Sequence, residues 1–292
     1  WHLLMGLPRR IISSQRRVLA EIHCRTAISE RVKITHNSRR SVEAGSGVVN
    51  QRRVNFGHDF VDPDEKTRRV GSVFRTVAKR YDVMNDVMSF GLHRIFKRIA
   101  IETTSLRPRS KVLDVAGGTG DLCALLADVV GREGQVILLD INESMTDVGR
   151  DKLINSGYAW IQATVADAEK LPFPDGYFDA ITIAFGLRNM TNKDRALSEC
   201  HRVLKPGGTL VILEFSTAKN PLLKTAYRFY QQSWPIAGQL IAGNSAPYRY
   251  LIESIDVHPN QSELNAMIKS AGFGEVRYEN LLGGVVAIHR AV

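Results

Sequence analysis

Short apolar runs alternate with segments of helical hydrophobic spacing between residues 110 and 215. Apolar runs of this kind are typical of strands that are buried on both faces of a parallel sheet. The alternation predicts a doubly wound, mostly parallel α/β sheet joined by right-handed crossovers. We expect strands near 111–116, 135–140, 159–164, 179–185 and 208–214, and helices near 120–130, 143–155 and 191–204.

Helical spacing also marks two segments outside this region. Residues 66–100 carry it with a polar loop in the middle, and residues 220–256 carry it again. A helix pattern at 261–271 then precedes two strand patterns, EVRYENL and VVAIHR, which flank Gly283 and Gly284. Paired glycines between strands favour a hairpin, so we expect the last two of seven strands to be antiparallel.

The stretch KVLDVAGGTGDL, residues 111–122, runs a strand pattern directly into Gly117, Gly118 and Gly120. Glycines between a strand and a helix let the backbone approach a ligand closely, and the helix start offers free N–H groups. A bare tight turn is the other interpretation, because glycine fingerprints are weakly specific.

An acidic residue follows this turn at the spacing found in nucleotide-binding folds. Asp140 ends the second strand pattern, about 20 residues after the glycines, where a carboxylate can accept hydrogen bonds from a ribose diol. NAD enzymes share this layout, so these residues leave the cofactor class open. The dinucleotide pattern G-x-G-x-x-G/A fails, however, because Cys123 stands at its third glycine position.

The composition is that of a globular protein. With 292 residues and 44% apolar content, the chain can bury one large core. No run approaches the roughly 18 consecutive apolar residues that span a bilayer. The three cysteines form no C-x-x-C motif and no His/Cys cluster, so we expect neither a disulfide framework nor a metal site. This cysteine usage suits a reducing compartment.

The positive charge of the chain is concentrated at its N-terminus. Of the net charge of +9, residues 1–57 hold +8, from ten Arg and one Lys against three Glu. The remainder shows no basic stripe with interleaved aromatic residues, so nucleic-acid binding is not expected.

Residues 1–54 lack a sustained periodicity, and we expect a basic, disordered extension preceding a domain at 55–292. The Arg-rich, acid-poor composition partly fits a mitochondrial transit peptide. The chain begins with Trp1, which is typical of a fragment or of a reading frame begun upstream of the true start, and the upstream start is favoured. A basic arm that touches anionic lipid is a further interpretation.

Several stretches resemble one enzyme family. The glycine turn, read as G-G-T-G-D, resembles the first motif of S-adenosylmethionine (SAM) methyltransferases. Over about residues 55–292 the chain resembles the ubiquinone/menaquinone biosynthesis C-methyltransferases. The most specific stretches are YDVMNDVMSFGLHRIF at 81–96, FGLRNM at 185–190 and RVLKPGGTLVILEFS at 202–216.

The chain departs from the family pattern at two positions. Phe96 stands where the family usually has Trp, so a ring remains but the indole N–H is lost. Ala184 stands where bacterial members often have Ser, which removes a hydroxyl. An insertion that is common in mitochondrial members is absent, and this favours a bacterial-like member.

The resemblance implies SAM as methyl donor within a class I methyltransferase fold, with helical cover segments at about 66–100 and 220–256. Asp167 would accept a hydrogen bond from the adenine amino group, although a helix cap or turn residue is the alternative there. The implied cofactor-binding residues are Gly117, Gly118, Thr119, Gly120, Asp140, Asp167 and Ala168.

The implied reaction methylates a ring carbon of a polyprenylated hydroquinone, which requires loss of a phenolic proton. Arg188 and Asn189 follow the fourth strand at its carboxyl end, where ligands bind in open parallel sheets. An arginine is no base, since its pKa exceeds ~12, but it can lower the pKa of a phenol and orient a water. Tyr81 and Asp82 would complete the relay. A surface ion pair for Arg188 and a core aromatic for Tyr81 are the alternatives.

A prenylated substrate implies work at a membrane surface or transfer from a partner. The resemblance therefore implies peripheral contact with a membrane or with other quinone-biosynthesis proteins, and it is compatible with a homodimer. A bacterial member would be cytoplasmic, at the inner face of the plasma membrane, and a mitochondrial one would lie at the matrix face of the inner membrane.

Two other functions stay open on the sequence. A catalytically silent SAM-fold scaffold of a biosynthetic complex would carry the same residues. An NAD(P)-dependent oxidoreductase is opposed by Cys123 and by the acidic Asp121 beside the pyrophosphate position.

Overall fold

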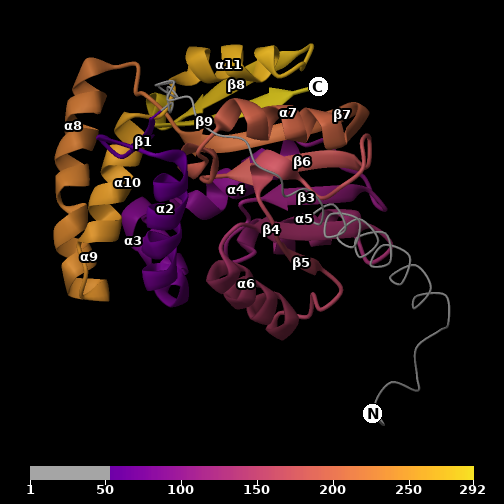
Figure 1. Cartoon of the computed structure of the whole chain (residues 1–292), viewed down its shortest axis with the longest axis horizontal. Coiled ribbons are helices and arrows are strands. Elements are labelled where there is room, and N and C mark those ends of the chain that lie inside the picture. The colour runs from indigo at the N-terminus through magenta and orange to yellow at the C-terminus, as the bar shows by residue number, and fades with distance from the viewer. Residues whose placement is uncertain (1–52) are drawn as a thin grey trace, which may run out of the picture. The chain divides into compact units, whose positions relative to one another are not determined.

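The fold is seen in a computed structural model, which describes residues 53–292. Seven strands form one sheet in the order β5-β4-β3-β6-β7-β9-β8 (Figure 1). The first five are parallel and the last two antiparallel, which confirms the expected doubly wound fold. Their bounds are β3 Lys111–Val115, β4 Gln135–Asp140, β5 Gln162–Val165, β6 Phe178–Ala184, β7 Leu204–Phe215, β8 Val276–Leu281 and β9 Val286–Ala291.

Helices cover both faces of this sheet because alternate residues of each buried strand point to opposite sides. Leu113 and Ile181 pack with residues of α7 (Lys193–Val203) and α11 (Gln261–Ser270). Val112 and Leu138 instead pack with residues of α4, α5 and α6. The bounds of these three helices are Leu92–Glu102, Asp121–Val130 and Glu143–Asn155. The apolar runs read from the sequence are thus buried on both faces.

Two helical segments that are far apart in sequence pack on each other at one end of the sheet (Figure 1). Met84 and Met88 share a buried cluster with Trp234, Tyr248 and Leu251. The first segment contains α2 Pro63–Val77, a short turn Ala78–Arg80 and α3 Tyr81–Ser89, and the second contains α8 Pro221–Gln232, α9 Trp234–Ala242 and α10 Ala246–Asp256.

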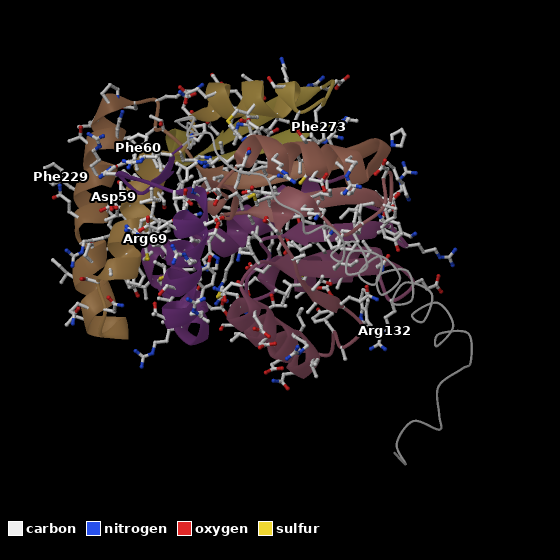
Figure 2. The ribbon with its side chains drawn as sticks, viewed as in Figure 1. Asp59, Phe60, Arg69, Arg132, Phe229 and Phe273 are labelled. Carbon is white, nitrogen blue, oxygen red and sulfur yellow. The ribbon has the colours of Figure 1, made fainter. Side chains whose placement is uncertain are left out.

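A hairpin that the sequence pattern did not predict precedes α2. Strands β1 (Val54–Phe56) and β2 (Asp59–Val61) pair antiparallel, and three residues are too few to show a periodicity. Phe56 stacks on Tyr250 with ring centroids 4.5 Å apart. Arg69 of α2 lies beside Asp59, with Nη1 3.4 Å from Oδ2 (Figure 2). The hairpin therefore joins both cover segments.

Two strand boundaries differ from the sequence expectation. β5 begins at Gln162 rather than near 159, because residues 158–161 form a turn closed by the Ile161 N–H and the Tyr158 carbonyl at 3.0 Å. β7 begins at Leu204 rather than near 208. Its pairing register with β6 shifts between Phe178 and Ala180. Residues 1–52, which hold most of the expected basic extension, lie outside the described residues.

Candidate active site

The glycine turn after β3 has the tight geometry that its sequence suggested. Gly118 and Gly120 adopt φ of 58° and 78°, in the left-handed region that favours glycine. A Cβ on Gly117 would lie 2.7 Å from Asp114 Oδ2. Gly149 of α6, which the sequence analysis did not single out, is also needed because a Cβ there would lie 2.8 Å from the Gly118 carbonyl oxygen. Small residues thus let α6 pack directly against the turn.

Asp140 ends β4 beside this turn. Its carboxylate accepts hydrogen bonds from the backbone N–H of Gly118 at 3.0 Å and of Asn142 at 2.8 Å. The side chain is buried, and burial raises the pKa of Asp140 to about 6 despite these two bonds. Each oxygen keeps a free lone pair that could receive a hydroxyl of a ligand.

A cavity of about 210 Å³ opens at Asp140 between the carboxyl ends of the strands and α2. Gly118, Asp167, Ala168 and Asn189 also line it. Asp167 Oδ1 accepts the Glu169 N–H at 2.9 Å, so the cap interpretation is correct, yet the same residue faces the cavity. Gly117, Thr119 and Gly120 belong to the turn but do not line the cavity.

The structure places Thr119 and Asp82 together. The Thr119 hydroxyl donates to Asp82 Oδ1 at 2.6 Å, and Lys152 of α6 donates to Asp82 Oδ2 at 2.5 Å. Lys152 also pairs with Asp121, whose other oxygen lies 3.0 Å from Lys97 Nζ. Against the effect of burial, Lys97 and Lys152 lower the pKa of Asp121 to about 2. Asp82 therefore belongs to an ion-pair network beside the glycine turn, and the structure does not bring it to Arg188.

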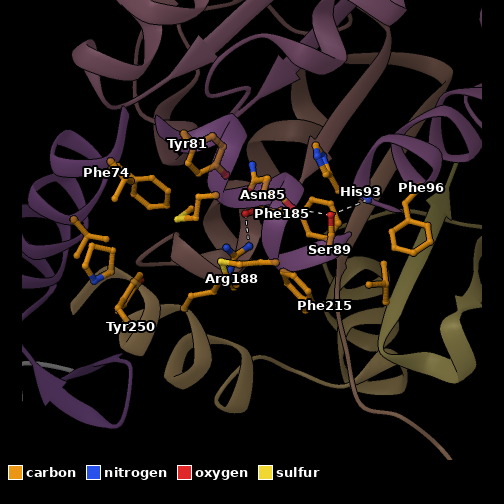
Figure 3. A pocket seen from close by; sticks show the side chains of 17 residues that line it. Phe74, Tyr81, Asn85, Ser89, His93, Phe96, Phe185, Arg188, Phe215 and Tyr250 are labelled. Carbon is orange, nitrogen blue, oxygen red and sulfur yellow. Dashed lines mark hydrogen bonds between the residues drawn. The ribbon is translucent and has the colours of Figure 1, made fainter. Parts of the chain in front are cut away.

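A second, apolar cavity of about 60 Å³ adjoins the first (Figure 3). Phe74, Tyr81 and Phe185 line both cavities and therefore form the boundary between them. Burial raises the pKa of the Tyr81 phenol although Arg188 opposes this, so the phenol is a neutral hydrogen-bonding group at neutral pH. Met84 and Met88, which pack in the buried cluster between the two cover segments, also line this cavity.

Arg188 lies in the apolar cavity within a buried ion pair. Its Nη1 donates to Glu214 Oε1 at 3.0 Å and also to the Phe185 carbonyl, while its backbone N–H donates to Glu214 Oε2 at 3.2 Å. Only 7% of Arg188 and 1% of Glu214 are exposed, so the surface ion pair considered from the sequence is wrong. The Nε of Arg188 is buried without a hydrogen-bond partner, so this donor is free for a ligand.

Two partners of these residues were missed from the sequence. Glu214 is the lone acid in the apolar run LVILEF of β7, and that isolation was the available signal. Tyr250 of α10 donates through its hydroxyl to Asn189 Oδ1 at 3.1 Å. No sequence signal connects Tyr250 with Asn189, because the two residues are 61 positions apart.

The described part of the chain holds no group of three or more His, Cys, Asp or Glu side chains that could bind a metal ion. None of its helices is long and apolar enough to cross a membrane.

The sheet order, the glycine turn after β3 and the acid that ends β4 define the class of SAM-dependent methyltransferases. Solved methyltransferases of this class from Aquifex aeolicus and Thermotoga maritima share the fold, with TM-scores of 0.52 and 0.56 at 19% and 18% identity. The match with the Aquifex protein covers 79% of this chain and 98% of that protein, and the match with the Thermotoga protein covers 76% and 99%. The [4+2]-cyclase SpnF is also similar, with a TM-score of 0.53 at 18% identity over 77% of this chain and 96% of its own. The fold alone therefore does not decide the activity.

The sequence places the chain more narrowly: it belongs to the ubiE/COQ5 methyltransferase family, whose profile matches residues 63–292. A ubiquinone/menaquinone biosynthesis C-methyltransferase from Saccharophagus degradans is 53% identical over 83% of this chain and 98% of its own length. The protein of the same name from Neisseria meningitidis is 53% identical over 82% and 98%.

Proposed function

We propose that this protein transfers the methyl group of SAM to a ring carbon of a polyprenylated hydroquinone in ubiquinone or menaquinone biosynthesis. One observation carries this proposal: Tyr81, Phe74 and Phe185 separate a polar cavity that holds Asp140 from an apolar cavity that holds the buried Arg188. A donor and an aromatic acceptor bound on the two sides would meet at this boundary. The names of the relatives at about 53% identity agree with this assignment.

In this proposal the polar cavity holds SAM. Asp140 accepts hydrogen bonds from the ribose diol, and Asp167 and Ala168 contact the adenine ring. Thr119 already donates its proton to Asp82, so its hydroxyl oxygen is left as an acceptor for the amino group of the methionine part. Of the turn at 117–120, Gly118 lines this cavity.

The chain's own residues have two tasks in the reaction. Phe74, Tyr81 and Phe185 exclude water and hold the ring at the sulfonium, which supplies an electrophilic methyl group. Arg188 stabilises the phenolate through its free Nε and orients the water that takes the phenolic proton. Glu214 keeps the guanidinium in place, and Asn189 is positioned by Tyr250. The new carbon–carbon bond replaces the carbon–sulfur bond, and the sulfonium leaves as the neutral thioether S-adenosylhomocysteine. The ring then regains aromaticity as the methylated carbon loses its proton and the phenol oxygen takes one up, so one proton is released overall.

A turnover assay tests the proposal. The purified protein, SAM and a short-chain methoxy-benzoquinol or naphthoquinol should give the C-methylated ring, which mass spectrometry detects. SAM binding without turnover on either ring would favour a silent scaffold, and NADH binding in place of SAM binding would favour an oxidoreductase. Comparing both rings also decides which quinone is made.

We also propose peripheral contact with an anionic membrane, at the inner face of the plasma membrane in a bacterial cell. The support is an outer face of α8 and α9 that carries the exposed side chains of Leu222, Phe229, Ile236 and Leu240. Phe229 points away from the protein at this edge (Figure 2). Residues 215–252 contain four Lys or Arg and no Asp or Glu, so the face matches anionic lipid. An isologous dimer through it would bring like charges together.

A further inference from the structure

A third cavity carries two lysines, Lys66 and Lys193, that the proposed methyl transfer does not use. It measures about 620 Å³ and lies between the β1–β2 hairpin, the start of α2, the start of α7 and the segment between α10 and α11. It adjoins the SAM cavity at Pro63, Glu169 and Thr191. Arg188 and Tyr250 line both this cavity and the apolar cavity, whereas Asp140 and the glycine turn do not line it.

Two ammonium groups on its wall share one neutral acceptor. Lys66 Nζ donates to the carbonyl oxygen of Met190 at 2.9 Å, and Lys193 Nζ lies 3.5 Å from the same oxygen. Only 3% of Lys66 is exposed. Within residues 53–292 neither nitrogen has a carboxylate within 4 Å. Burial and the nearby charge of Lys193 lower the pKa of Lys66 to about 7. An ammonium has three donors, so most of the hydrogen-bonding capacity here is unused.

Further unpaired donors face the same space. His258 is 9% exposed, and both of its ring nitrogens are buried without a hydrogen-bond partner. Burial and the neighbouring Lys193 and Arg188 hold the pKa of His258 well below its usual range, so the ring is neutral with one N–H. The first turn of α7 also lines the cavity, and a helix start favours negative charge. A buried polar group that stays unpaired destabilises the fold, so these donors favour a ligand that pairs with them.

Two carboxylates oppose this charge from the same wall. Glu169 accepts the Asn192 N–H at 2.7 Å, and Asp194 lies in the first turn of α7. Neither forms an ion pair with Lys66 or Lys193. Neither lysine therefore has a carboxylate at ion-pair distance in the described part of the chain, although Glu169 acts on both lysines from further away.

We propose that this cavity is a binding site for a doubly charged oxyanion of the phosphate class, held by Lys66, Lys193 and the N–H of His258. Two negative charges balance the two ammonium groups. Several oxygen atoms supply the acceptors that one carbonyl cannot. The cavity is larger than an inorganic ion requires, so a small phosphate ester also fits.

Calorimetric titration of the full-length protein with inorganic phosphate and with glycerol phosphate tests this site. Chloride keeps the ionic strength constant, because exposed charges respond to salt. We expect saturable binding at one site, weakened at least tenfold by Lys66→Gln and by Lys193→Gln. Lys269→Gln, an exposed lysine of α11, is the matched control and should change nothing. Tighter binding of the ester would identify an organic phosphate as the ligand, and equal binding would identify free phosphate.

Several results would overturn the proposal. One is the absence of a saturable heat of binding when phosphate is added, and another is equal binding of phosphate by the two lysine variants and the control. A third is competition between SAM and phosphate, which would place phosphate in the cofactor cavity. Lys193 is only partly buried, so Lys193→Gln should fold even if Lys66→Gln does not. SAM affinity and methyl transfer are measured on the same samples. Their failure would contradict the proposed function and leave the oxyanion site intact.

Discussion

Individual residues of this site combine burial with unsatisfied hydrogen-bonding capacity. Asp140 is held by two backbone N–H groups and still faces a cavity. Arg188 is paired with Glu214 and still has an unpartnered Nε. Desolvation shifts pKa values and strengthens charge interactions, so such residues are sensitive to conservative substitution.

Asp140→Ala should weaken SAM binding by the value of two hydrogen bonds to a charged acceptor, roughly 1.5–3 kcal/mol each. The pH dependence follows from the raised pKa of about 6. The ribose diol of SAM favours the ionised carboxylate. SAM binding should therefore weaken as the pH falls through 6, and in this pH range binding should release protons from Asp140. Calorimetry in buffers of different ionisation enthalpy measures both. Asp140→Asn should remove this proton release, and if the release persists, Asp140 is not the titrating group.

Arg188→Lys should reduce the methylation rate on the order of 10²–10³, while SAM affinity stays nearly unchanged. Lysine keeps the charge but loses the planar fork that holds Glu214 and the phenolate together. The loss should shrink at alkaline pH, where more bound hydroquinol ionises unaided. Single-turnover rates across pH measure this. Arg277→Lys, an exposed position, is the control. Equal losses of affinity and rate would instead indicate a structural ion pair.

At the scale of elements, two helical segments that are far apart in sequence, residues 63–89 and 221–256, form one cover at the end of the sheet. Tyr230 of α8 donates to the Met88 carbonyl at 3.1 Å and stacks on Phe90 with ring centroids 5.4 Å apart. Residues of α2, α3 and α10 line the apolar cavity. Helices α8 and α9 pack on this cover through Tyr227, Tyr230 and Trp234, while their outer face carries exposed apolar side chains. These two helices thus have two apolar faces, and the exposed one needs a partner.

A Phe229→Ser/Leu240→Ser double variant should lose most binding to anionic vesicles, and salt should weaken the binding of the unmodified protein. Each basic residue near such a surface contributes about 1 kcal/mol, which salt screens. Co-sedimentation measures the bound fraction. Ile154→Ser removes an exposed apolar side chain of α6 and serves as control. If the double variant instead turns a dimer into a monomer and still binds vesicles, the face is a self-association surface.

At the scale of the whole molecule, the four buried clusters all lie within residues 77–291. Three of them take their members from the sheet and its covering helices, and the fourth joins the two cover segments. The hydrophobic clusters of the described residues thus lie in the sheet, its covering helices and the two cover segments.

Deleting residues 1–52 should leave the melting temperature and the SAM affinity of the protein nearly unchanged. The deleted segment is basic and lacks a core-forming pattern. Differential scanning calorimetry of both forms measures the effect. A drop of more than a few degrees, which corresponds to about 1 kcal/mol or more for a domain of this size, would show that the segment packs against the domain.

The sequence by itself determined that a mostly parallel sheet forms, and it determined the place of the glycine turn and of Asp140. These features are local: apolar runs, helical spacing and glycines between a strand and a helix can be read within windows of a few residues. The short β1–β2 hairpin and the start of β5 escaped it, because three- or four-residue segments show no period.

Only the tertiary structure decided the partners of the charged side chains. Asp82 pairs with Lys152, which is 70 residues away, and Arg188 pairs with Glu214, which is 26 residues away. Lys66 and Lys193 meet at one carbonyl although they lie far apart in the sequence. Whether an ionisable group is paired, buried or left open to a ligand depends on the elements that surround it in space, and no local pattern encodes that environment.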